Sequence, residues 1–133
     1  MKLSQLPRSA VLACGLALSA AHIALAAPQD FQFQVVEPEL RQGDKVTFTI
    51  AITDLRTNAA VADASIIASQ MDMTPDGMAG MSGKVTPVAT GTPGRYGFVA
   101  NLGMAGNWRL AIAARLPGEA EVVWREVTIK VTP

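Results

Sequence analysis

From residue 31 onward the chain alternates apolar and polar residues with a period of two, and clusters of Gly, Pro, Asn and Asp interrupt the alternation. The clearest example is residues 46–53, where Val46, Phe48, Ile50 and Ile52 are separated mainly by threonines. Such alternation places apolar side chains on one face of a strand. The pattern predicts an all-β, immunoglobulin-like antiparallel β-sandwich of about seven strands, at residues 31–35, 46–53, 62–70, 84–89, 95–102, 108–114 and 121–131.

Several large side chains fall within the later strands. Trp108 and Trp124 are expected to be two core anchors, because tryptophan contributes a large apolar surface to a sandwich interior. Four arginines are expected to point outward as solvated residues of the sheet faces: Arg95, Arg109, Arg115 and Arg125.

The first 26 residues have the composition of a secretory signal peptide. Lys2 and Arg8 precede an apolar run over residues 11–25, and small residues at positions 24 and 26 favour cleavage before Ala27. The sequence therefore predicts a leader at 1–26, one mature domain at 27–133, periplasmic localisation and no stable membrane insertion after cleavage. Two alternatives are a retained membrane anchor, although the run is shorter than the roughly 20 residues a spanning helix needs, and a lipoprotein site at Cys14.

Composition after residue 26 excludes several kinds of chemistry. The single Cys and the single His both lie in the leader, so residues 27–133 have no thiol and no imidazole. Disulfides, zinc sites built on Cys or His, and Ser-His-Asp catalysis are therefore excluded, and we expect a protein that is not an enzyme. Nine basic against eleven acidic residues argue against a nucleic-acid partner, which requires a basic surface.

Methionines gather in one segment that departs from the strand pattern. Met71, Met73, Met78 and Met81 fall within 11 residues and are interleaved with Asp, Pro and Gly, which interrupt regular structure. A fifth methionine, Met104, lies in a turn between two late strands. Because the loops of a sandwich gather at its two ends, Met104 can face the other four.

Clustered thioethers suit a soft metal ion. Thioether sulfur is neutral and polarizable and discriminates against hard ions, so the segment predicts binding of Cu(I), or of Ag(I), with Asp72 or Asp76 as a further ligand. Cu(II) usually requires imidazole, which is absent after residue 26. Two alternatives are an apolar lid that packs on the sandwich and an adaptable surface for a protein partner.

The order of these motifs resembles that of the YtkA-like domains, which are related to the periplasmic part of FixH. The resemblance rests on residues 38–54, 62–68, 71–81, 93–96 and 102–108. It implies an exported, non-enzymatic immunoglobulin-like domain associated with copper efflux or with oxidase assembly. It also implies the candidate ligands Met71, Met73, Met78, Met81 and Met104. FixH proteins keep an N-terminal membrane helix, whereas this leader has the features of a cleavable one.

Two functions are expected from these features. The first is a periplasmic protein that binds or delivers Cu(I), or Ag(I), through the methionine segment. The alternative is a docking module that uses the same surface to join a metal-efflux or oxidase-assembly complex without holding metal.

Overall fold

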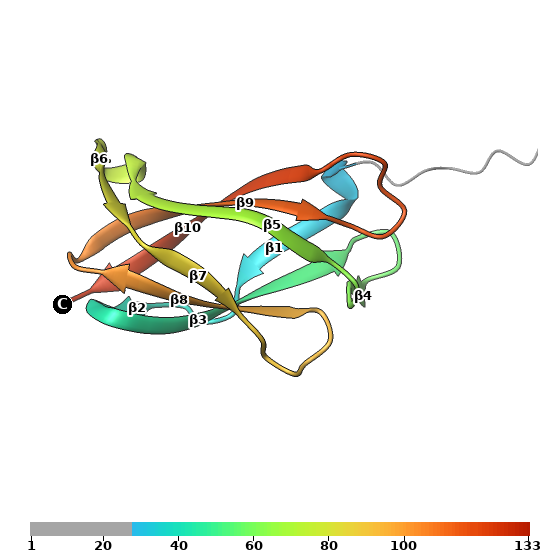
Figure 1. Ribbon diagram of the computed structural model, residues 1–133, viewed down its shortest axis with the longest axis horizontal. Coiled ribbons are helices and arrows are strands. Elements are labelled where there is room, and N and C mark those ends of the chain that lie inside the picture. Colours follow the sequence, from blue (N-terminus) through green and yellow to red (C-terminus); the bar gives the residue numbers. More distant parts are fainter. Residues whose placement is uncertain (1–27) are drawn as a thin grey trace, which may run out of the picture.

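Two β-sheets pack face to face in the computed structural model, which describes residues 28–133 (Figure 1). The first sheet has the order β1 (Phe31–Val35), β3 (Gly43–Asp54), β8 (Arg95–Leu102) and β7 (Val85–Val88), with β4 (Ala59–Ala60) also paired to β3. The second has the order β2 (Leu40–Arg41), β10 (Val123–Thr132), β9 (Gly106–Arg115), β5 (Ser65–Met73) and β6 (Met78–Gly83). Two short 3-10 turns complete the structure, η1 (Pro28–Asp30) and η2 (Thr74–Asp76).

The expected all-β sandwich is confirmed. Each of the seven expected strands is present, and the pairing is antiparallel except between β2 and β10, which are parallel. The described part of the chain contains three further strands, β2, β4 and β6, of which β6 forms where the sequence predicted an irregular connection. No helix within residues 28–133 has the length and apolar character needed to span a bilayer. The expected leader and the lipidation site at Cys14 lie outside the described residues.

The core forms between the inward faces of the two sheets. In β3 the alternation places Phe48, Ile50 and Ile52 inward, where all three are fully buried. Phe48 is the register partner of Phe98 in β8, and their rings stack with centroids 5.5 Å apart. Such a pair contributes about 0.5–1.5 kcal/mol beyond the burial of its apolar area.

The two tryptophans lie in opposite environments. Trp108 is buried in the core, as expected, whereas Trp124 is 65% exposed, so its assignment to the core is wrong. Val123, Ile129 and Val131 occupy the inward phase of β10, which places Trp124 on the outer face.

Arg125 follows on the inner side of β10 at the rim of the sandwich, and its guanidinium lies 5.9 Å from the centre of the Phe33 ring. The expectation that Arg125 is a solvated face residue is therefore also wrong.

Candidate metal centre

The methionine segment forms one end of the sandwich. β5 runs to Met73, η2 reverses the chain, and β6 returns beside β5 (Figure 1, left). The turn between β8 and β9, which contains Met104, lies at the same end (Figure 1). The fold thus brings the two methionine-bearing segments together, although about 20 residues separate them in the sequence.

Met71 and Met73 belong to the hydrophobic core. Both lie on the inward side of β5, and both side chains are fully buried. Met71 is the register partner of Leu110 in β9, which is also fully buried. The expectation that this segment departs from the strand pattern is wrong for Met71 and Met73, because β5 extends three residues beyond its expected end and gives both an inward position.

Met78, Met81 and Met104 are accessible from solvent. Their exposed fractions are 36%, 40% and 38%. In the β5–β6 pair, Asp72 is opposite Ser82 and Met73 is opposite Met78, so residues 79–81 form a bulge on the β6 side. Met78 and Met81 therefore both lie at this bulge, beside the end of β5.

A hydrogen-bonded clasp joins η2 to the start of β9. The Asp76 carboxylate accepts a hydrogen bond of 2.7 Å from the backbone N–H of Asn107 and one of 3.0 Å from its side-chain amide. These bonds lower the pKa of Asp76 below its usual value, the backbone bond most strongly. The clasp fixes the methionine segment next to the turn that contains Met104.

Gly106 allows the close approach that this clasp needs. A Cβ atom at Gly106 would lie 2.5 Å from Oδ2 of Asp76 and 2.7 Å from the methyl carbon of Met73, and its φ of 141° is also unfavourable for other residues. Met73 therefore packs directly beneath the turn from which Met104 projects.

Trp108 supports this end of the molecule from inside. Its indole Nε1–H donates a hydrogen bond of 2.9 Å to the backbone carbonyl of Met104. A Cβ atom on Gly83, the last residue of β6, would lie 3.2 Å from the Trp108 ring. The same buried side chain thus contacts β6 and holds the turn of Met104.

Asp72 forms a buried ion pair with Arg109 on the outer face of the second sheet. Its carboxylate accepts a 2.6 Å bond from Arg109 and a 3.0 Å bond from the backbone N–H of Thr74. Arg109, which is half-buried, also bonds Glu126 at 3.2 Å. The Arg109 bond lowers the pKa of Asp72 to about 2. The expectation of a solvated side chain at Arg109 is therefore wrong.

Thioethers dominate the donor atoms available at this end. The carboxylates of Asp72 and Asp76, which were expected as further ligands, already accept the hydrogen bonds described above. In the described range, 28–133, no three His, Cys, Asp or Glu side chains gather closely enough to hold an ion. The sequence analysis did not identify Gly106, Asn107 and Trp108 as supporting residues, although they are consecutive in the sequence and begin β9.

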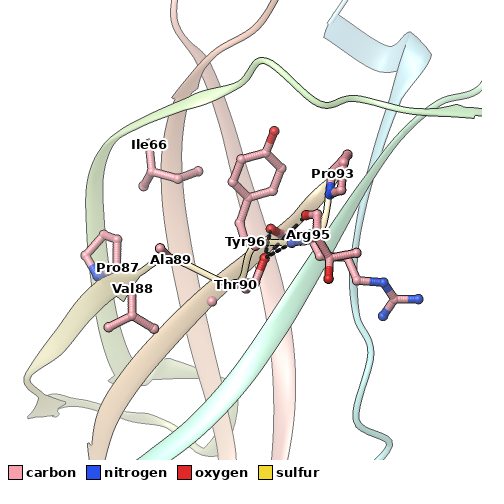
Figure 2. Close-up of a pocket in the computed structure, with 11 residues that line it drawn as sticks. Ile66, Pro87, Val88, Ala89, Thr90, Pro93, Arg95 and Tyr96 are labelled. Carbon is pink, nitrogen blue, oxygen red and sulfur yellow. Dashed lines mark hydrogen bonds between the residues drawn. The ribbon is translucent and has the colours of Figure 1, made fainter.

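A separate pocket of about 310 Å³ lies between β5 and the loop that joins β7 to β8 (Figure 2). Ile66, Pro87 and Tyr96 are among its lining residues, which include no methionine. The Tyr96 hydroxyl donates to the carbonyl of Val61 at 2.5 Å and accepts from the N–H of Ala64 at 3.0 Å. This hydroxyl therefore ties the chain before β5 to β8.

The chain matches one family model and is weakly similar to several solved structures. No curated protein matches the chain significantly. Among solved structures, the ZirS C-terminal domain is 12% identical with a TM-score of 0.47, and the match covers 100% of this chain and 86% of that one. The Lin-41 filamin domain is 12% identical with a TM-score of 0.44, and that match covers 75% of this chain and 91% of the other. A family model described as YtkA-like matches residues 25–113. The chain therefore belongs to the YtkA-like family.

Proposed function

We propose that this domain binds Cu(I), or Ag(I), at the end of the sandwich where Met78, Met81 and Met104 are exposed. The observation that carries the proposal is that three accessible thioethers come from two segments joined by the Asp76–Asn107 clasp. Neutral sulfur ligands select soft monovalent ions over Mg²⁺ and Ca²⁺. The domain acts as a binding or delivery protein, not as an enzyme, and works in the periplasm after removal of residues 1–26.

The three exposed methionines are the primary ligand set in this proposal. Met71 and Met73 were also predicted as ligands from the sequence, but their side chains fill the core. Turning either one outward would leave a cavity, and removing a core side chain of this size costs about 2–5 kcal/mol. Met73 instead supports the proposed site from inside the core, where its methyl group packs against Gly106.

A competition experiment tests the proposal. The protein is titrated against a chromogenic Cu(I) chelator under anaerobic, reducing conditions, and so are the variants M78L/M81L/M104L and M71L/M73L. Leucine keeps the apolar volume and removes the sulfur. We expect wild type and M71L/M73L to withdraw Cu(I) from the chelator and the surface triple variant to fail. Equal competition by the triple variant, or no competition by wild type, would show that the proposed site is wrong.

The position of the bound ion can be tested by fluorescence. In the W124F background Trp108 is the remaining tryptophan, and its Nε1–H bonds the carbonyl of Met104. We expect Ag(I) to change the Trp108 emission of this variant in a saturable way and to leave the M78L/M81L/M104L/W124F variant unchanged. An identical response in both proteins would place the ion elsewhere.

A specific observation also favours the docking alternative. β6 is an edge strand of the second sheet, so among residues 28–133 no strand pairs with the side of β6 turned away from β5. Met78 and Met81 on this strand are half-exposed. In this alternative, the partner is a metal-efflux or oxidase-assembly complex. Docking through apolar contacts predicts that the leucine triple variant still captures the partner, because leucine keeps the apolar surface. Docking that needs metal predicts loss of capture in the same variant.

A further inference from the structure

The five methionines of the described chain fall into two sharply different environments. Met78, Met81 and Met104 have exposed fractions of 36–40%, whereas Met71 and Met73 are fully buried. We propose that Met78, Met81 and Met104 are sites of selective oxidation to methionine sulfoxide, and that this oxidation and soft-metal binding exclude each other. The selectivity of oxidation follows from the difference in burial alone, whereas the mutual exclusion of oxidation and metal binding rests on the proposed function.

The oxidant is a hydroperoxide, and hydrogen peroxide is the simplest case. A lone pair of the thioether sulfur attacks one peroxide oxygen, an S–O bond forms, and the O–O bond breaks. The departing oxygen leaves as water after proton transfer between the two peroxide oxygens. Sulfur loses two electrons and the peroxide gains them. The step requires direct contact between sulfur and oxidant, which exposure at this end of the sandwich permits.

The fold tolerates the product at the surface and not in the core. At the three exposed positions the new oxygen can point into water, so the sandwich stays folded. At Met71 or Met73 the same oxygen would be buried among the apolar side chains of the core, and burial of a polar oxygen there is unfavourable. Oxidation of the buried pair therefore requires the core to open first.

The lone pair that attacks the oxidant is the one that binds a soft cation. A sulfoxide offers a hard oxygen in place of the soft sulfur, and Cu(I) and Ag(I) bind hard donors poorly. Bound metal in turn occupies the lone pair and slows the attack. Oxidation of these methionines therefore abolishes metal binding at the proposed site, and bound metal protects the same methionines from oxidation.

Peptide mapping tests the selectivity. The folded protein is treated with hydrogen peroxide, quenched and digested with trypsin, and fragment ions locate the added oxygens within peptides 57–84 and 96–109. We expect the three exposed methionines to oxidise at least about tenfold faster than Met71 and Met73. Urea-unfolded protein is the control, in which all five should react at similar rates. Equal rates at all five positions in the folded protein, with near-ultraviolet circular dichroism unchanged, would overturn the proposal.

A second experiment distinguishes failure of this inference from failure of the proposed function. The same treatment is repeated on protein loaded with Ag(I), which does not cycle with peroxide as Cu(I) does. We expect slower oxidation at Met78, Met81 and Met104 and no change at Met71 and Met73. If the protein fails to bind Ag(I), the proposed function is wrong, and selective oxidation is decided by the first experiment. If Ag(I) binds and the three rates are unchanged, the exclusion between metal and oxidant is wrong.

Discussion

The Asp76 carboxylate accepts hydrogen bonds from both the backbone N–H and the side-chain amide of Asn107, at 2.7 and 3.0 Å. These two contacts connect η2, which separates the paired methionines of β5 from those of β6, to the first residues of β9. They extend to η2 the connection between β5 and β9, whose strand pairing ends at Asp72 and Arg109. The clasp therefore ties the segment that contains Met78 and Met81 to the turn that contains Met104.

Asp76→Ala is expected to loosen this end of the sandwich. The N–H of Asn107 loses its acceptor, so its hydrogen exchange, measured by NMR, should become faster while that of the core strands stays unchanged. Cu(I) affinity should fall about tenfold, a typical effect of removing a residue that orients metal ligands. Asp76→Asn is the matched control, because its carbonyl oxygen can still accept from the Asn107 N–H. Unchanged exchange at Asn107 in Asp76→Ala would contradict the role of the clasp.

Asp72→Asn is expected to change how stability depends on pH. The folded-state pKa of Asp72, about 2, lies below the usual value of 3.8, so its carboxylate stabilises the folded protein above pH about 4. That contribution is lost as the pH falls from about 4 toward 2. Urea unfolding of wild type should therefore weaken more steeply across this window than unfolding of the variant, which should be less stable at pH 7. Asp63→Asn, which changes an exposed aspartate, should keep the wild-type slope.

The buried and exposed methionines should differ in their effect on stability. Met71→Ala removes a fully buried side chain and should lower the free energy of unfolding by about 2–5 kcal/mol. Met78→Ala removes a half-exposed one and should change it by about 0.5 kcal/mol or less. Met71→Leu, which conserves volume, should cost less than about 1.5 kcal/mol. Chemical denaturation measures all three, and a similar loss for both alanine variants would contradict the division between core and surface.

The strands were predictable because their signals are local. Alternation in 46–53 and the turn residues between the later segments locate the strands without knowledge of their partners. The phase of β10 was not predictable in this way, because Val122, Val123 and Trp124 are consecutive and apolar, so either phase buries large side chains. Packing against β9 selects the phase that buries Val123 and exposes Trp124.

The candidate site was predicted only in part, for a related reason. The alternation Met71-Asp72-Met73 continues the period of β5 and indicates a strand, but the neighbouring Pro and Gly residues favoured a loop. The ion pair of Asp72 was not predictable because its partner, Arg109, lies 37 positions away and meets it only through the register of β5 and β9. Contacts set by strand register require the sheet to be known.

Gly106→Ala should destabilise the protein although it adds one methyl group. The new Cβ would lie within 2.7 Å of both Met73 and Asp76, and the backbone at Gly106 has a φ of 141°. Overpacking of this kind costs about 1–3 kcal/mol, and it should also weaken the clasp. Gly80→Ala is the matched control in the same region, since a Cβ there meets nothing within 4 Å. Equal stability of the two variants in urea would show that the approach of Met73 to this turn is looser than the structure indicates.

The tryptophans should report separately on the two surfaces of the second sheet. Trp124→Phe leaves Trp108, which is buried and hydrogen-bonded to the carbonyl of Met104, so its emission should be blue-shifted and poorly quenched by acrylamide. Trp108→Phe leaves Trp124, whose 65% exposure should give red-shifted emission and severalfold stronger quenching. Trp108→Phe also removes the Nε1–H donor beneath the turn of Met104, so it should weaken Cu(I) binding, whereas Trp124→Phe should not. Equal Cu(I) affinity in the two variants would show that Trp108 supports the core and leaves the position of Met104 to the Asp76–Asn107 clasp.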